Sequence, residues 1–215
     1  MNIAIIPTPL SGRVAAVTSK SDAHRHIIAA ACADRPTKIN LFRSCEDIET
    51  TLSCIKTLGA CVETGDGYVI ITPVKDFALQ HRPLLGCGES GTTARLLLPF
   101  AAALCGCFSM TGGGRLPERP FLPLIRAMRE NGCSFSSENL PFEVSGRLLP
   151  GEFVLPGDVS SQFISGLLFA LPLLERESLI KTTTPLQSVG YVNMTLSILR
   201  SYGIDIISEN GSFRV

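Results

Sequence analysis

The sequence repeats at a spacing of about seventy residues, and this repeat restricts the possible folds more than any other feature. Three segments, 17–34, 86–104 and 156–174, each place Gly, Ser or Lys in a turn before a small, apolar helix. Ser21, Ser90 and Ser160 lie 69 and 70 residues apart in them. The repeat predicts one domain built from three similar units with pseudo-threefold symmetry.

A second set of segments follows the first at a similar spacing. Each has apolar residues at helical spacing and then a glycine, in 47–63, 119–136 and 191–208. These glycines, Gly59, Gly132 and Gly203, lie 73 and 71 residues apart, where the C′ position of a helix is expected. A short β-like run follows each glycine, and the run "CVETGDGYVIITP" predicts a hairpin around its Gly-Asp-Gly turn.

Each unit is therefore predicted to contain a strand, a helix, a strand, a helix and paired strands. The fold class is α/β (α+β), with three β-α-β-α-β-β units over about 17–85, 86–155 and 156–215. The first helix of each unit is nearly all apolar and should be buried under the sheets, whereas the second is amphipathic and should face outward. This symmetry would bring the three polar helix starts to one side of the domain.

Composition argues against several classes of function. Nineteen basic residues balance nineteen acidic ones, so the whole chain has no field to hold a nucleic acid or an anionic membrane. The most apolar stretch, 96–108, is shorter than the ~20 residues of a membrane span and contains Pro99 and Gly106. The first residues lack the basic and apolar regions of a secretory signal. A cytoplasmic protein without a nucleic-acid or membrane partner is expected.

The eight cysteines do not predict disulfides or a metal site. Most lie among apolar helix-forming residues, as Cys54 does, so reduced core thiols are expected. Cys105 and Cys107 form the only tight pair, and no C-x-x-C or neighbouring His gives the spacing of a zinc site. His24 and His26 are two residues apart on an expected helix and point to different faces. No metal site is expected from these residues.

The polar helix starts predict a site for an anion. Free backbone N–H groups and the helix dipole favour negative charge there, although the serines could also be ordinary N-caps. Lys20, Arg25 and Arg95 lie within a turn of these starts. The two arginines are on helices otherwise rich in Ala and Leu, where an unpaired buried charge is costly. An anionic ligand would offset that cost.

Two glycine-rich stretches are weak matches to nucleotide-binding motifs. "GCGESG" at 86–91 fits G-x-G-x-x-G, but no Asp or Glu follows between Thr92 and Pro117 to bind a ribose. "GGGRLPERP" at 112–120 lacks the Gly-Lys-Ser/Thr of a Walker loop. It is expected to be a flexible turn that carries Arg115 and Arg119.

Five motifs give the chain a resemblance to a known family. "SKSDAHR", "GESGTTAR", "LPERP", "DVSSQF" and "SVGY" occur in this order between residues 19 and 191. They resemble the N-terminal part of the 5-enolpyruvylshikimate-3-phosphate synthases, also called 3-phosphoshikimate 1-carboxyvinyltransferases. Enzymes of that family have two similar domains of three β-α-β-α-β-β units, with the active site between them. The resemblance implies that residues 1–215 are a single N-terminal domain, whose partner is a C-terminal domain of the same protein.

The resemblance implies transfer of the enolpyruvyl group from phosphoenolpyruvate to the 5-hydroxyl of shikimate 3-phosphate. This reaction belongs to the shikimate pathway to chorismate and the aromatic amino acids, and it needs no cofactor. The family's proton-transfer carboxylates and lysine lie in the C-terminal domain, so this half is expected to bind substrates and to be inactive alone. The family's extreme N-terminal strand crosses to the other domain, which implies that residues 1–13 are a crossover segment without its partner here.

The resemblance also assigns residues to the shikimate 3-phosphate site. Ser21 and Arg25 would lie near the shikimate carboxylate. Ser160, Ser161 and Ser188 would hold the 3-phosphate group. All five residues lie within the quoted motifs or directly beside them.

A second set is assigned to phosphoenolpyruvate and to the space between the ligands. Lys20, Gly91 and Arg119 would contact phosphoenolpyruvate. Gln162 would lie between both ligands, and Tyr191 would pack beside the shikimate ring. Together with Thr92 and Arg95, the implied substrate-binding residues are Lys20, Ser21, Arg25, Gly91, Thr92, Arg95, Arg119, Ser160, Ser161, Gln162, Ser188 and Tyr191.

Other interpretations remain open at this point. "GESG" departs from the family's common "GNAG", with Glu89 and Ser90 in place of Asn and Ala. The sister transferase that acts on UDP-N-acetylglucosamine shares the fold but carries a reactive cysteine near 112–120, whereas none lies between Cys107 and Cys133. A non-catalytic module that binds a phosphate ligand is a further alternative. A purely structural repeat protein would leave the basic residues at the helix starts unexplained.

Overall fold

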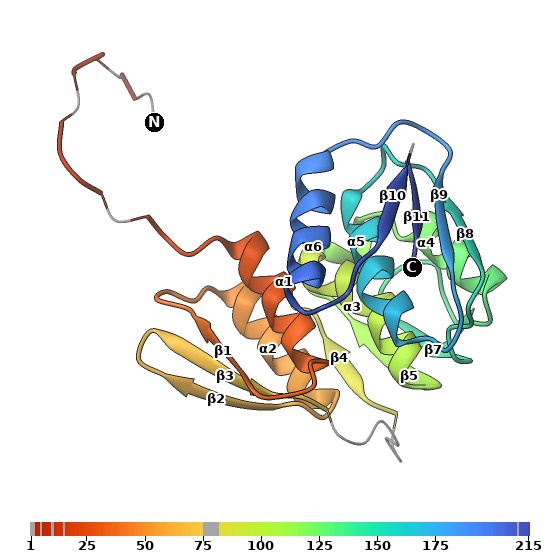
Figure 1. Ribbon diagram of the computed structural model, residues 1–215. Coiled ribbons are helices and arrows are strands. Elements are labelled where there is room, and N and C mark those ends of the chain that lie inside the picture. Colours follow the sequence, from red (N-terminus) through yellow and green to blue (C-terminus); the bar gives the residue numbers. More distant parts are fainter. Residues whose placement is uncertain (1–2, 5, 10, 15, 75–81, 210) are drawn as a thin grey trace.

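The computed structural model describes residues 3–4, 6–9, 11–14, 16–74, 82–209 and 211–215. In Figure 1 the described chain forms three sheet-and-helix units, and the segment before the first helix leads away from them. The first unit contains α1 (Lys20–Ala31), β1 (Thr37–Asn40), α2 (Glu46–Thr57), β2 (Cys61–Gly65) and β3 (Tyr68–Thr72).

The second and third units each have four strands and two α-helices. The second unit contains β4 (Leu84–Gly86), α3 (Gly91–Leu104), β5 (Cys107–Thr111), η1 (Leu116–Glu118), α4 (Leu122–Glu130), β6 (Ser134–Phe135) and β7 (Phe142–Ser145). The third unit contains β8 (Glu152–Leu155), α5 (Ser161–Ala170), η2 (Leu171–Leu173), β9 (Leu179–Thr182), α6 (Val189–Ser201), β10 (Ile207–Glu209) and β11 (Ser212–Arg214).

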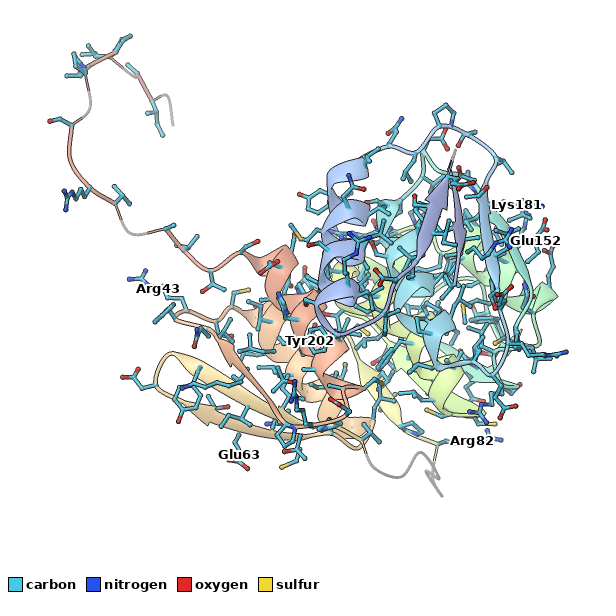
Figure 2. All side chains as sticks on the ribbon, in the orientation of Figure 1. Arg43, Glu63, Arg82, Glu152, Lys181 and Tyr202 are labelled. Atoms are coloured by element: carbon cyan, nitrogen blue, oxygen red, sulfur yellow. The ribbon has the colours of Figure 1, made fainter. Side chains whose placement is uncertain are left out.

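The second and third sheets have the same topology. Their strand orders are β4-β5-β7-β6 and β8-β9-β11-β10. The first two strands of each sheet are parallel and are joined through α3 or α5, and the remaining pairs are antiparallel. On the outer surface, Lys181 and Glu152 form an ion pair at 2.7 Å between β9 and β8 (Figure 2).

The first sheet differs from the other two. Its order is β1-β3-β2, with both pairs antiparallel, so the described residues contain no parallel strand before α1. The fold class and the three repeated units are confirmed, but the expected first strand of unit one is wrong for this part of the chain. The described residues between 3 and 19 belong to no helix or strand, and the remainder of the expected crossover segment 1–13 lies outside the described residues.

Glycine ends the second helix of each unit, as the spacing predicts. Gly59, Gly132 and Gly203 follow α2, α4 and α6 and have φ angles of +103°, +95° and +84°. A side chain with a Cβ atom rarely adopts such angles, so glycine is the suitable residue for turning the chain out of the helix. The predicted hairpin is also confirmed, because β2 and β3 pair in antiparallel register around Gly67 at φ +76°.

The buried helices pack closely at the centre of the molecule. Helices α3 and α5 are almost wholly buried, and α1 packs beside α3. A Cβ on Gly166 of α5 would lie 2.5 Å from the backbone oxygen of Arg95 on α3, so glycine allows this close approach. All eight cysteines are free, and Cys54, Cys87, Cys105 and Cys133 are buried. Within the described ranges, no helix has the length and apolar character required to cross a membrane.

Candidate functional site

The first helices of the three units begin at serine N-caps. Ser19, Ser90 and Ser160 each accept a hydrogen bond from a backbone N–H in the first turn, at 3.2–3.4 Å. The repeat pattern in the sequence matched Ser21 with Ser90 and Ser160. The N-cap of α1 is instead Ser19, two residues earlier. Ser21 lies inside the first turn of α1, where its side chain is available for another role.

A cavity of about 320 Å³ lies where α1, α5 and α6 begin, beside α3. Its walls are mainly hydroxyl, amide and guanidinium groups, and no Asp or Glu is among its lining residues. Val159 is the one lining residue that the sequence did not indicate. The predicted site residues that line the cavity are Ser21, Arg25, Arg95, Ser160, Ser161, Gln162, Ser188 and Tyr191.

Arg25 is a buried cation with neutral partners. Its side chain is on α1 and is only 1% exposed. Its guanidinium donates to Thr195 Oγ1 at 2.7 Å, to the backbone oxygen of Ser21 at 2.7 Å and to Ser165 Oγ at 3.4 Å. Burial lowers the pKa of Arg25, because water no longer solvates the charged form. The cavity therefore has a positive charge in its wall that none of these hydrogen-bond partners neutralises.

Arg95 on α3 is connected to the third unit through Gln162. Its Nη1 donates to Gln162 Oε1 at 3.2 Å, and its Nη2 donates to the backbone oxygen of Pro120 at 3.3 Å. Gln162 in turn donates from Nε2 to Thr92 Oγ1 at 2.9 Å. Thr92 and Gln162 thus join the starts of α3 and α5. Three of the predicted residues form a single hydrogen-bonded group.

The free positive charge is concentrated around Arg95 and Arg119. The Nε atom of Arg95 is buried and has no hydrogen-bond partner among the described residues. Burial lowers the pKa of Arg95, and the nearby positive charge of Arg119 lowers it further. Two like charges held this close destabilise each other unless an anion lies between them. The geometry therefore suits a multiply charged anion.

Gly91, Arg119 and Lys20 form the side of the site next to the cavity. A Cβ on Gly91 would lie 2.6 Å from Arg119 Nη1, so glycine makes room for the guanidinium against the start of α3. Lys20 Nζ is 2.6 Å from Asp47 Oδ2, and this hydrogen bond raises the pKa of Lys20 against the opposing effect of burial. Lys20 is therefore held by Asp47 on α2, a partner that the sequence did not indicate.

A buried chain of polar side chains runs beneath the site. His24 Nδ1 lies 2.7 Å from Thr51 Oγ1, which lies 2.7 Å from Thr93 Oγ1, and Thr93 donates to Ser90 Oγ at 2.7 Å. These contacts join α1, α2 and the start of α3. Burial lowers the pKa of His24 to about 4, so its imidazole is neutral at pH 7. Ser90 is only 1% exposed and acts as a cap within this chain.

Ser188 has an unusual backbone conformation at the mouth of the cavity. It precedes α6 with φ +55° and ψ +41°, the left-handed region. It is the only non-glycine residue with positive φ in the part of the chain described. Its side chain makes no capping hydrogen bond to α6. Backbone strain of this kind clusters at active sites and at segments that hold ligands.

Two residues that fix Arg25 were not identified from the sequence. Thr195 lies four residues after Tyr191 on α6, and Ser165 lies four residues after Ser161 on α5. This spacing places each on the same helix face as a predicted site residue. Thr195 also donates to Ser165 Oγ at 2.9 Å, which connects the two helices. Helical periodicity extended inward from the motifs would have indicated both residues.

Comparisons with known proteins give a consistent result. A family model described as EPSP synthase (3-phosphoshikimate 1-carboxyvinyltransferase) matches residues 5–215. A protein of Clostridium beijerinckii named 3-phosphoshikimate 1-carboxyvinyltransferase is 37% identical to this chain, and the match covers 97% of this chain and 50% of the relative. A protein of the same name from Clostridium botulinum is 39% identical, and the match covers 96% of this chain and 49% of the relative. The solved structure of EPSP synthase from Acinetobacter baumannii is similar with a TM-score of 0.78 at 26% identity, covering 95% of this chain and 46% of that one. The chain thus spans about half the length of the curated relatives it matches.

Proposed function

Because the chain belongs to the EPSP synthase family, we propose that it forms the substrate-binding half of an enzyme that transfers the enolpyruvyl group of phosphoenolpyruvate to shikimate 3-phosphate. The observation that carries this proposal is the cavity at the helix starts, where the buried Arg25 has no acidic hydrogen-bond partner among the residues that the structure describes. A second polypeptide half completes the site, because relatives are about twice as long as this chain.

Shikimate 3-phosphate occupies the cavity itself. Its phosphate lies at the start of α5, where Ser160 and Ser161 offer hydroxyls and the helix offers backbone N–H groups. Ser188 faces it from the start of α6. The carboxylate of the ligand pairs with Arg25, whose charge it neutralises. The phenol ring of Tyr191, 5.8 Å from the Arg25 guanidinium, covers the shikimate ring.

Phosphoenolpyruvate binds beside the cavity, against the start of α3. Arg119 and Arg95 approach each other there, and an anion with a carboxylate and a phosphate relieves their repulsion. Gly91 makes room for the Arg119 guanidinium at this helix start, and Lys20 on α1 is close enough to Arg119 for their charges to interact. Gln162 separates the two ligands because it is hydrogen-bonded to both Arg95 and Thr92.

The reaction needs proton transfer as well as binding. The 5-hydroxyl of shikimate 3-phosphate loses its proton and attacks C2 of phosphoenolpyruvate, while the methylene carbon gains a proton to give a tetrahedral intermediate. The bond from C2 to the phosphate oxygen then breaks and the methyl group loses a proton, which restores the enol double bond. The cavity holds and orients the anions, but its lining includes no carboxylate to move these protons. The second half supplies those groups.

A reconstitution assay tests this function. The chain is mixed with the remaining half of the Clostridium beijerinckii relative, and phosphate release from phosphoenolpyruvate is measured with shikimate 3-phosphate present. We expect turnover in the mixture and none from either half alone. Arg119→Ala should raise KM for phosphoenolpyruvate far more than KM for shikimate 3-phosphate, whereas Arg115→Ala, in the same loop and exposed, should change neither. Ligand binding without turnover in the mixture would support a non-catalytic binding module instead.

A further inference from the structure

A buried network of four polar side chains beneath the start of α3 has no role in the proposed reaction. It consists of His24 on α1, Thr51 on α2, and Ser90 and Thr93 at the start of α3, each at most 1% exposed. The three helices pack against one another (Figure 1). Three contacts of 2.7 Å join the side chains in the order His24, Thr51, Thr93 and Ser90. Each contact requires one donated proton, so the order fixes where the protons lie.

The last link determines the direction of the whole network. Thr93 donates to Ser90 Oγ, and a hydroxyl group has only one proton to donate. Thr93 therefore accepts in its contact with Thr51, so Thr51 is the donor there. The proton of Thr51 is then used as well, and Thr51 accepts from Nδ1 of His24. The geometry thus places the imidazole proton of His24 on Nδ1.

The surroundings of the other ring nitrogen agree with this assignment. His24 Nε2 is buried and has no hydrogen-bond partner in the described part of the chain. With the proton on Nδ1, Nε2 has only an unused lone pair, whereas the opposite direction would leave a buried N–H group without an acceptor, which is rare. The ring carries a single proton at pH 7, because burial lowers the pKa of His24 to about 4. Among the charged groups that act on it, Asp47 on α2 raises this pKa, and Lys20 and Arg25 on α1 lower it.

The backbone oxygen of Asp47 is a competing acceptor for both threonines. It lies 3.3 Å from Thr51 Oγ1 and 3.4 Å from Thr93 Oγ1. The links within the buried network are shorter, at 2.7 Å, so the threonine protons stay in the network. If the link between Thr51 and Thr93 were broken, the Thr93 hydroxyl could turn to Asp47 and leave Ser90. The direction therefore depends on an unbroken series of hydroxyl groups.

Every hydrogen bond of the buried network points toward Ser90, which is the N-cap of α3. The donor groups therefore have the positive ends of their dipoles on the side of this helix start, and in a low dielectric they strengthen one another. The dipole of α3 has its positive end at the same place. Gly91 follows Ser90, and the Arg119 guanidinium packs against it. The network thus makes the start of α3 more favourable for an anion.

We propose that His24, Thr51 and Thr93 are positioning residues for phosphoenolpyruvate, which act through the Ser90 cap of α3. This inference rests on the proposed function, which assigns phosphoenolpyruvate to this helix start. The three residues keep Ser90 Oγ as the acceptor of Thr93, whose backbone N–H also donates to it at 3.2 Å, and so hold the first turn of α3 in place. Ser90 supplies the acceptor that alanine, the family's common residue at this position, lacks.

Nitrogen NMR of the imidazole rings tests the direction of the buried network. The full chain is labelled with a heavy nitrogen isotope in its three histidines, and the signals of His24 are identified by their loss in His24→Gln. At pH 7 we expect a proton on Nδ1 of His24 and none on Nε2. In Thr51→Val the proton should no longer be confined to Nδ1, because valine cannot accept it, whereas Thr51→Ser should keep it there. A proton on Nε2 in the unmodified chain would overturn the inference.

Kinetics of the reconstituted enzyme test the effect on phosphoenolpyruvate. The Thr51→Val chain is mixed with the remaining half of the Clostridium beijerinckii relative, and KM is measured for both substrates. We expect KM for phosphoenolpyruvate to rise about fivefold and KM for shikimate 3-phosphate to change less than about twofold, because only the start of α3 loses aligned dipoles. Thr51→Ser keeps the hydroxyl and should restore the KM of the unmodified chain. Thr57→Val is the matched control, because Thr57 is exposed on the same helix and donates to the backbone oxygen of Ser53; it should leave both KM values unaltered.

The outcomes separate the inference from the proposed function. Turnover in which Thr51→Val raises both KM values alike, or neither, would overturn the inference while the proposed function stands. The same holds if Thr51→Ser is impaired as much as Thr51→Val. A mixture without turnover, together with a proton on Nδ1 of His24, would overturn the proposed function and support the direction of the buried network. Thermal unfolding of each variant chain alone verifies that it folds, and the spectrum of the unmodified chain decides the direction even if Thr51→Val does not.

Discussion

Replacing Arg25 by methionine should leave the chain folded and abolish the binding of shikimate 3-phosphate that we propose. The change removes hydrogen bonds to Thr195, Ser21 and Ser165, each worth about 1 kcal/mol net. Thr195 and Ser165 keep their mutual hydrogen bond at 2.9 Å, so neither hydroxyl is left alone. The change also removes a charge whose burial costs several kcal/mol. Because these effects oppose each other, the free energy of unfolding should change by less than about 2 kcal/mol.

Thermal unfolding with and without ligand provides the assay. At a ligand concentration of ~100 Kd, the unmodified chain should gain about 2.7 kcal/mol, which raises Tm by roughly 6 °C for a chain of this size. Arg25→Met should show no rise at the same concentration. Arg126→Met, an identical change at an exposed position on α4, should keep the full rise. The reasoning is refuted by an Arg25→Met chain that retains the ligand shift, or by one that loses more than about 4 kcal/mol of stability without ligand.

Three further changes test other parts of the site. Gly91→Ala places a Cβ 2.6 Å from Arg119 Nη1, so the guanidinium must move by ~1 Å. In the reconstituted enzyme, KM for phosphoenolpyruvate should then rise about tenfold or more, while the stability of the chain stays nearly unchanged. An unchanged KM would contradict this prediction. Burial lowers the pKa of His24 from 6.5 to about 4. As the pH falls, the imidazole is therefore protonated in the unfolded chain at a higher pH than in the folded chain. The free energy of unfolding, measured with urea, should therefore fall by roughly 3 kcal/mol between pH 6.5 and 4. His24→Gln should make the free energy of unfolding less dependent on pH in this range. An equally steep pH dependence in the variant would be evidence against a neutral, buried His24. Ser188→Gly should raise the free energy of unfolding by up to about 1 kcal/mol, because glycine tolerates φ +55°. The same change should reduce the rise in Tm that the ligand causes. A rise as large as that of the unmodified chain would mean that the Ser188 hydroxyl does not contact the phosphate.

The regular spacing of the motifs explains why so much of the fold could be predicted. Glycines at constant intervals predicted the ends of α2, α4 and α6, because a left-handed C′ residue is a local requirement that the sequence must meet. The polar helix starts predicted the cavity in the same way. Since the repeats place equivalent helices in equivalent positions, residues as far apart as Arg25 and Ser188 could be assigned to one cavity.

Contacts between helices were harder to predict. The pairing of Lys20 with Asp47 depends on how α1 and α2 pack, and no local pattern marks an aspartate on an amphipathic helix as a partner. The same is true of the buried contact between Thr51 and Thr93. Among the described residues, the strand expected before α1 is absent for another reason. Local sequence indicates that a segment can form a strand, but not which sheet edge it will join.

A crystal structure of the chain with shikimate 3-phosphate tests the central claim most directly. We predict that the ligand phosphate lies at the start of α5, within hydrogen-bond distance of Ser160, Ser161 and Ser188. Its carboxylate should lie against the Arg25 guanidinium and its ring beside Tyr191. A ligand bound elsewhere on the molecule, or an empty cavity at a ligand concentration that raises Tm, would contradict the account.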